Sequence, residues 1–166
     1  MFDAVSLEVY RHRFSAIADE MGAALERSAF SANIQERRDY SCALFDAHGQ
    51  MVAQAAHIPV HLGAMPRSVE AAITQCAPLS LGDVVLLNDP SAGGTHLPDF
   101  TTVAPIYVDE HLIGYSATRA HHADIGGMSP GSMPLSRSLF QEGLIITHQD
   151  CASRCCKRCH LGISCS

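Results

Sequence analysis

The sequence predicts an α+β fold, in which one long N-terminal helix and a shorter second helix pack on a mostly antiparallel sheet built from hairpins. Two observations favour this class. Apolar residues near the N-terminus recur every three or four positions, which is typical of a helix with one buried face. Further along, short strand-like runs are separated by turn residues, and one pair is spaced for a tight hairpin. No glycine-rich phosphate motif occurs, so the chain is not expected to bind a nucleotide itself.

The long helix is expected over Ser6–Ser28, with Ser6 as its N-cap. A helix that packs on the core explains its apolar stripe, and pairing with a partner helix is the alternative. The following segment, Ser31–Asp39, is polar and dense in charge. We interpret it as a solvated turn, although its arginines could instead bind a carboxylate or phosphate. The stripe consists of Leu7, Tyr10, Phe14, Ile17, Met21 and Leu25.

Strand-like runs follow the polar segment. Tyr40–Phe45 and Gln50–Gln54 are expected to pair across a turn, and Val84–Leu87 forms a later strand. Cys42 lies within the first of these strands, where a thiol is more often a small core side chain than a nucleophile.

A stretch with two histidines precedes the second helix. Pro59 opposes a regular helix, so His57–Gly63 is predicted to be a loop, and its histidines His57 and His61 are secondary candidates for a site. Pro66 is then expected to be the first residue of the second helix.

The most informative stretch is a predicted hairpin flanked by metal-capable residues. Its strands are Phe100–Val108 and Leu112–Ala120, and they turn at Asp109–His111. A tight hairpin brings its two outer ends together, so residues before the first strand and after the second should be neighbours. The first cluster consists of Asp89, His96 and Asp99, and the second of His121, His122 and Asp124.

Imidazole and carboxylate groups together suit divalent metals such as Zn, Mn or Fe. His96, Asp99 and His121 would supply three protein ligands and leave a position open, which is the pattern of a catalytic metal site. The alternative is that these residues only form turns and caps in loops. A serine hydrolase is disfavoured, because no Gly-x-Ser-x-Gly motif occurs.

Composition excludes some classes of protein. The chain has 166 residues and a net charge of −6, which disfavours a nucleic-acid partner because no basic face is available to neutralise phosphates. No apolar run is long enough for a membrane span, and no signal-peptide core is evident, so a cytoplasmic location is expected.

The last twenty residues differ in composition from the rest. We predict a domain over residues 1–146 and an atypical Cys-rich tail over 147–166. Within the tail, Cys156 to His160 match the c-type haem attachment pattern, and a zinc site is a second alternative. We interpret the tail mainly as a segment that does not continue the preceding fold, with exposed thiols that are prone to oxidation.

Five segments are distinctive: EMGAALERSAFSANIQERRDYSCALFD, HIPVHLGAMP, GDVVLLNDPSAGGTHLPDFTTVAPI, TRAHHADIGGMSPGSMP and FQEGLII. Together they resemble the hydantoinase B family, whose members also form the C-terminal half of ATP-dependent 5-oxoprolinases. They are similar, too, to the matching subunit of ATP-dependent acetone and acetophenone carboxylases. The resemblance covers about residues 3 to 146.

The resemblance implies a division of labour. A partner subunit of the hydantoinase A type binds ATP and phosphorylates the substrate, and the B-type subunit hydrolyses the activated lactam or carboxylates the activated ketone. In the carboxylase relatives a divalent metal is held by residues that match His96, Asp99 and His121. The candidate catalytic residues around that metal are Asp89, which would bind or support it, and His122 and Asp124, which would orient its ligands.

Family members continue well past the FQEGLII segment, so we expect a truncated family domain that exposes apolar surface and forms an oligomer. The leading hypothesis is a subunit or fragment of an ATP-dependent cyclic-amide hydrolase that opens a lactam or hydantoin ring. The alternatives are a ketone carboxylase-type subunit and an inactive remnant that acts only as a binding fragment. The motifs are shared by both branches and do not separate hydrolase from carboxylase.

Overall fold

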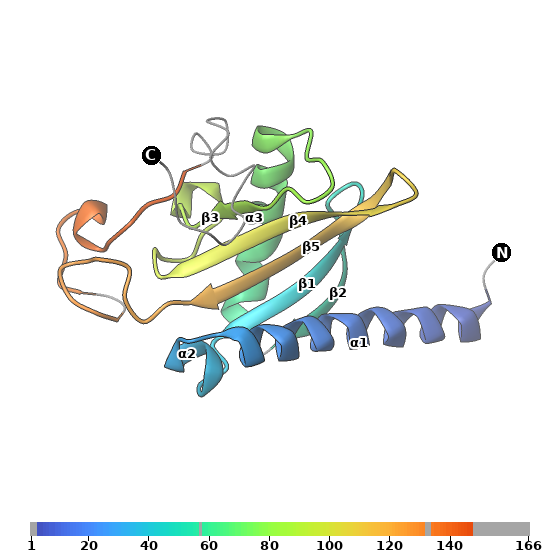
Figure 1. Cartoon of the computed structure of the whole chain (residues 1–166), viewed down its shortest axis with the longest axis horizontal. Coiled ribbons are helices and arrows are strands. Elements are labelled where there is room, and N and C mark those ends of the chain that lie inside the picture. The colour runs from blue at the N-terminus through green and yellow to red at the C-terminus, as the bar shows by residue number, and fades with distance from the viewer. Residues whose placement is uncertain (1–2, 57, 132–133, 148–166) are drawn as a thin grey trace.

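The computed structural model describes residues 3–56, 58–131 and 134–147 (Figure 1). A five-stranded antiparallel sheet has the strand order β2-β1-β5-β4-β3, and the described helices pack against it, which confirms the predicted α+β class. The helices are α1 (Ala4–Ser28), α2 (Ala32–Gln35) and α3 (Pro59–Cys76), with two short 3₁₀ turns, η1 (Pro90–Ala92) and η2 (Leu139–Gln141). The strands are β1 (Tyr40–Asp46), β2 (Met51–Ala56), β3 (Val85–Leu87), β4 (Asp99–Val108) and β5 (His111–His121).

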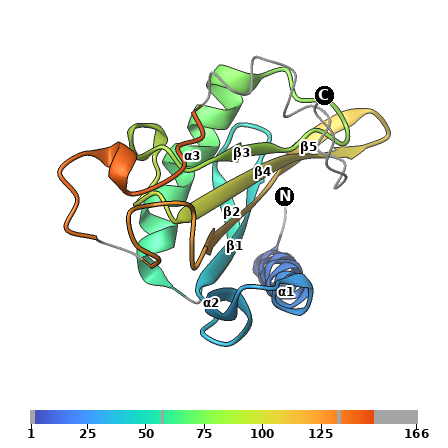
Figure 2. The same cartoon turned by 60° about the vertical axis from the view of Figure 1, so that its left-hand side comes forward.

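The two long helices cover opposite faces of the sheet (Figure 2). Successive side chains of a strand point to opposite faces. Along β1, Ala43 therefore joins the cluster that packs under Met65 and Val69 of α3, whereas Cys42 joins the cluster under Ala18 of α1. Burial raises the pKa of the Cys42 thiol to about 12, which agrees with the predicted role of this residue in the core.

The hairpin of β4 and β5 is confirmed, and its turn is tighter than predicted. Asp109 and Glu110 both have a positive φ, of 46° and 66°, which is the geometry of a two-residue turn that matches strand twist. The strands pair from Val108 and His111 at the turn to Asp99 and His121 at the far end. The two predicted metal ligands of this hairpin are thus the last pair of its ladder.

The start of α3 corrects two predictions. Residues 59–63 of the predicted loop are helical, and the helix does not begin at Pro66, because α3 already begins at Pro59. Proline is well tolerated at the first helical position, where its missing N–H would have no partner in any case. Pro66 lies inside the helix, where burial of the neighbouring Met65 and Val69 outweighs the lost hydrogen bond.

The start of α1 also differs from prediction. Asp3, not Ser6, is the N-cap: its carboxylate accepts a hydrogen bond of 2.6 Å from the backbone N–H of Ser6. The apolar stripe packs only toward the C-terminal end of the helix, near Met21 and Leu25, and Leu7 is 64% exposed. Within the described residues, no helix is long and apolar enough to cross a bilayer.

Candidate metal centre

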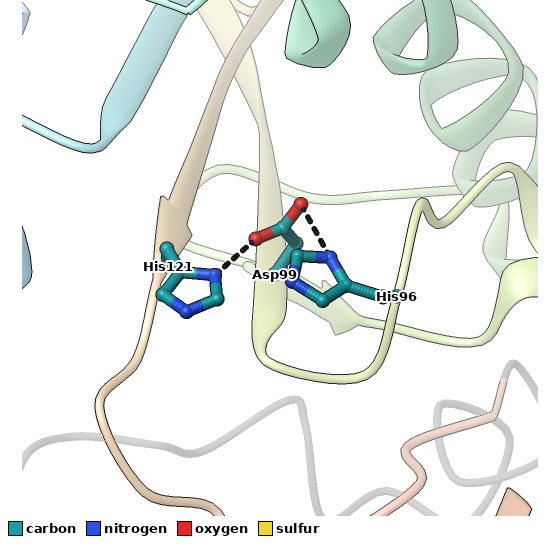
Figure 3. Close-up of side chains that lie close together, drawn as sticks. All are labelled: His96, Asp99 and His121. Carbon is teal, nitrogen blue, oxygen red and sulfur yellow. Dashed lines mark hydrogen bonds and ion pairs between the residues drawn. The ribbon is translucent and has the colours of Figure 1, made fainter. Parts of the chain in front are cut away.

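His96, Asp99 and His121 come together at the outer end of the hairpin, and we refer to these three residues as the His–Asp centre (Figure 3). Nδ1 of His121 lies 2.9 Å from Oδ1 of Asp99, and Nδ1 of His96 lies 3.0 Å from Oδ2 of the same carboxylate. One potential ligand atom from each residue lies within 4.8 Å of the other two. The two imidazole rings stack, with their centroids 4.9 Å apart.

Local backbone geometry positions each of these three side chains. Asp99 and His121 face each other as ladder partners, so the register of the hairpin fixes their separation. The loop before β4 carries His96, and the backbone N–H of Asp99 donates a 3.0 Å hydrogen bond to the carbonyl of His96. Upstream, Gly93 adopts φ +87° and lies so close to α3 that a Cβ atom there would sit 2.6 Å from the backbone nitrogen of Ser68. Only glycine permits this approach of the loop to the helix.

Asp99 is the electrostatic centre of the site. Its side chain is 1% exposed. Burial alone would raise the pKa of this carboxyl, but hydrogen bonds from His121, His61, His96 and Thr95 outweigh it and hold the pKa well below its usual range. The same contact acts on its partner, because the hydrogen bond to Asp99 raises the pKa of His121 despite the partial burial of the imidazole.

His61 belongs to this site, although the sequence indicated it only as a secondary candidate. It lies in the first turn of α3, is 2% exposed, and places Nε2 3.4 Å from Oδ2 of Asp99 and 3.6 Å from Oδ1 of Asp39. Asp39 ends the polar segment that we interpreted as a solvated turn, so one end of that segment does reach the site. The other secondary candidate, His57, lies outside the described residues, as does the cysteine tail from residue 148 onward.

The donor set of the His–Asp centre fits a divalent cation. Two imidazoles and one carboxylate converge, and in the described part of the chain every ion pair of Asp99 is with a histidine. A buried carboxylate needs a positive charge close by, which either imidazole protons or a metal ion can supply. The side chain of His96 is 26% exposed, so the site is accessible from one side. Such a three-ligand set suits Zn, Mn or Fe and leaves room for a further ligand.

The three predicted catalytic residues lie outside this group. Asp89 caps η1, where its carboxylate accepts a 2.8 Å hydrogen bond from the N–H of Ser91. Asp124 is exposed and accepts a 2.9 Å bond from the N–H of Gly126, which is the turn-forming role we had considered as the alternative. His122 lies edge-on to the ring of Phe100, and burial, followed by the nearby His121, lowers the pKa of its imidazole.

His122 and Asp124 line an apolar pocket of about 700 Å³, and their predicted role in orienting the ligands stays a prediction. The pocket lies between the end of α1 and the strands β3 to β5, and it includes Phe100 and Ala120, the ladder neighbours of Asp99 and His121. Because adjacent residues of a strand alternate in direction, this pocket lies on the face of the sheet opposite to the His–Asp centre.

The fold and the site define the chain as an α+β domain with a metal-capable His–Asp centre at the end of its central hairpin. The sequence model of the Hydantoinase B/oxoprolinase family matches residues 3–155, and the chain belongs to this family. This confirms the resemblance that the five sequence segments indicate.

Three comparisons illustrate the relationship. The 5-oxoprolinase of Saccharomyces cerevisiae is 48% identical over 147 residues, which are 87% of this chain and 11% of the yeast protein. The structure of the ATP-dependent caprolactamase from Pseudomonas jessenii superimposes with a TM-score of 0.76 at 30% identity, covering 89% of this chain and 26% of that one. Nucleotide-free acetone carboxylase gives a TM-score of 0.75 at 25% identity, covering 85% of this chain and 19% of that one. The chain thus spans a small part of each protein that it resembles.

Proposed function

We propose that this chain provides a metal-dependent centre for the ATP-dependent opening of a cyclic amide, such as a lactam or hydantoin ring. The observation that carries the proposal is the convergence of His96, Asp99 and His121 on one buried carboxylate at the end of a rigid hairpin. The names of two relatives support the substrate class, since a 5-oxoprolinase and a caprolactamase both act on lactams.

In this proposal His96, Asp99 and His121 hold the metal, which would supply a Lewis acid that polarises an amide carbonyl or acidifies a bound water. In the metal-free centre Asp99 is ionised down to acidic pH and lies against Nδ1 of both imidazoles, which keeps the three ligands together. His61 supports the carboxylate from the side of α3. A substrate would reach the centre from the side on which His96 is partly exposed.

A partner of the hydantoinase A type completes the proposed reaction. It would bind ATP and phosphorylate the cyclic amide, because this sequence contains no glycine-rich phosphate motif. The ATP dependence printed for the caprolactamase supports a nucleotide step in the relatives. A cytoplasmic hetero-oligomer is part of the same proposal.

A ketone carboxylase-type subunit is the second candidate. The similarity to acetone carboxylase supports it, and the same metal centre would serve either reaction. The third candidate is an inactive fragment that keeps the fold without turnover, and it differs from the other two in the substrate assays described below.

Metal analysis of the purified chain tests the centre. We expect near-stoichiometric Mn, Zn or Fe after reconstitution, and loss of that metal in a His96→Ala/His121→Ala double variant. The matched control is His12→Ala/His111→Ala, which removes two exposed histidines and should keep the metal. Metal that is retained in the His96→Ala/His121→Ala variant would contradict the site and would point to the cysteine tail, and a folded parent that binds no metal would contradict the site as well.

Substrate assays then separate the three candidates. The metal-loaded chain is combined with an A-type partner, ATP and either 5-oxoproline, a hydantoin, or acetone with bicarbonate. Ring opening that the double variant lacks supports the hydrolase. Carboxylation without ring opening supports the second candidate. Metal binding without turnover of any substrate supports the inactive fragment.

A further inference from the structure

We propose that Arg119 is a positioning residue that holds the separate segments of the His–Asp centre in register. This inference rests on the proposed function, because it concerns the same metal centre. Arg119 is the largest side chain in the described part of the protein that is fully buried, with 0% exposure. A buried guanidinium is costly unless its donors are used, so its contacts indicate what it does.

Among the described residues, Arg119 makes four hydrogen bonds, and each goes to a neutral oxygen. Nε donates to Oγ1 of Thr101 at 2.8 Å, and one terminal nitrogen donates to Oγ of Ser68 at 2.7 Å and to the carbonyl of Gly93 at 3.0 Å. The other terminal nitrogen donates to the carbonyl of His61 at 3.4 Å. The planar fork of arginine can serve several acceptors in fixed directions, which the single ammonium of lysine cannot do.

These acceptors belong to every segment that builds the centre. Arg119 and Thr101 are ladder partners, two positions along β5 and β4 from the pair His121 and Asp99, and they point to the same face of the sheet. Gly93 begins the loop that carries His96, three residues further on. His61 and Ser68 both lie on α3. One side chain therefore ties both strands, the loop and the helix together directly beneath the His–Asp centre.

The charge of Arg119 and its positioning role would have opposite effects on metal affinity. A buried positive charge near Asp99 repels a cation, so an effect through charge alone would weaken metal binding in the parent protein. Removing that charge would then strengthen binding, whereas loss of positioning would weaken it. The sign of the change distinguishes the two roles.

The test measures Mn²⁺ affinity of the full chain in two variants. Arg119→Lys keeps the charge but loses the fork, and Arg119→Met loses both while filling similar space. Positioning predicts weaker binding in both variants, by roughly 10–100-fold, as is typical when residues that support metal ligands are removed. Unchanged or tighter binding in folded Arg119→Met would overturn the inference.

Two milder variants test the same inference if the Arg119 variants do not fold. Thr101→Val removes the acceptor of Nε and preserves the shape of the side chain, and we expect a smaller loss of Mn²⁺ affinity in the same direction. Thr102→Val is the matched control: it removes a hydroxyl bonded to Thr118, one position away on the opposite face of β4. Equal affinities in these two variants would also overturn the inference.

A metal-free measurement separates this inference from the proposed function. Imidazole ¹H–¹⁵N spectra of the chelator-treated chain report the surroundings of His96 and His121. We expect Arg119→Lys and Thr101→Val to shift these ring signals and Thr102→Val to leave them unchanged. If the parent binds no metal but the ring signals of Arg119→Lys and Thr101→Val differ from those of the parent, the metal function is refuted and the positioning role is supported. Unshifted rings in folded variants would refute the positioning role, whatever the metal result.

Discussion

At the scale of single residues, the site is a buried carboxylate surrounded by imidazoles. Within the described chain, Asp99 pairs with His61, His96 and His121, and Thr95 donates to it as well. The hydrogen bonds outweigh burial and favour the ionised carboxylate. In the absence of metal, the same carboxylate favours the protonated form of its best-placed imidazole, that of His121. At the proposed metal site, protons and a metal ion would therefore compete for imidazole nitrogens.

The raised pKa of His121 predicts a pH-dependent contribution to stability in the chelator-treated chain. Folding raises the pKa of His121, so this imidazole stabilises the folded chain fully at pH values below its ordinary pKa of 6.5. The stabilisation is lost as the pH rises through the pKa of His121 in the folded chain. The difference in melting temperature between the parent and His121→Gln should therefore be larger at pH 5 than at pH 8.5.

The difference between variants is the appropriate measure, because the lowered pKa of His122 acts on stability in the opposite direction. His111→Gln, at an exposed position, serves as the control and should show no comparable trend. A difference for His121→Gln that grows toward pH 8.5 would contradict the assigned hydrogen bond.

Gly93 provides a second test at this scale. Gly93→Ala combines a positive φ with a Cβ atom 2.6 Å from the backbone of α3, so we expect it to lower the free energy of unfolding by on the order of 2–3 kcal/mol. It should also weaken metal binding, because the displaced loop carries His96. Gly82→Ala is the control: its φ is also positive, at +88°, but it has open space around it. Denaturant unfolding measures both variants. If Gly93→Ala and Gly82→Ala lose equal free energy of unfolding, the close packing of Gly93 on α3 contributes nothing to stability.

The sequence identified the three members of the His–Asp centre but not their strongest supports. Strand spacing alone indicates which residues end a hairpin, and this was enough for Asp99 and His121. The sequence indicates His61 only as a secondary candidate, because Pro59 beside it is compatible with a break in the helix. The sequence does not indicate Arg119, since no local pattern distinguishes a buried arginine from an exposed one on a strand.

At the scale of secondary-structure elements, the hairpin of β4 and β5 determines the geometry of the site. Its register was predictable, because two alternating apolar runs separated by a short polar turn allow few pairings. The start of α3 was not predictable in the same way. A proline near the beginning of a pattern is compatible with both a loop and a first helical turn, and only packing against the sheet decides between them.

A substitution in the hairpin turn should stabilise the protein. Glu110 has φ +66° and is exposed, and a left-handed conformation costs a residue with a Cβ atom about 1–2 kcal/mol. After the greater flexibility of glycine in the unfolded chain is allowed for, Glu110→Gly should raise the free energy of unfolding by about 0.5–1 kcal/mol.

Glu110→Ala tests whether that gain comes from the backbone. Alanine removes the charge but keeps a Cβ atom, so urea unfolding should show no comparable stabilisation. The Mn²⁺ affinity of both variants should equal that of the parent, because the turn lies at the opposite end of the hairpin. A gain from alanine as large as that from glycine would mean that charge, not backbone strain, limits the turn.

At the scale of the whole molecule, the sheet is covered unevenly. Helix α3 packs over one face, whereas α1 covers β1 and β2 on the other and leaves an apolar pocket beside β3 to β5. Periodicity predicted which residues of α1 share a face, but not where the surface that they cover ends. Leu7 at 64% exposure and Ile17 at 45% show that the stripe is only partly covered.

Metal binding should stabilise the whole domain, because a ligand that binds only the folded state shifts the unfolding equilibrium. Mn²⁺ at a hundred times its Kd adds about 2.7 kcal/mol. For a domain of this size that corresponds to a rise in Tm of roughly 5–10 °C. Calorimetry with and without EDTA measures it. The His96→Ala/His121→Ala variant should show no metal-dependent shift, and a shift of equal size there would contradict the site.

The placement of Asp99 and His121 at the two outer ends of one hairpin has a consequence for biosynthesis. Asp99 leaves the ribosome 22 residues before the histidine that pairs with it. At ordinary rates of translation, this leaves an interval of roughly one to four seconds in which the carboxylate and His96 are present without their third partner. If the centre holds a metal as proposed, its three ligands come together only after β5 has been synthesised and has paired with β4. The order of synthesis would thus separate the formation of His96 and Asp99 from the completion of the proposed site.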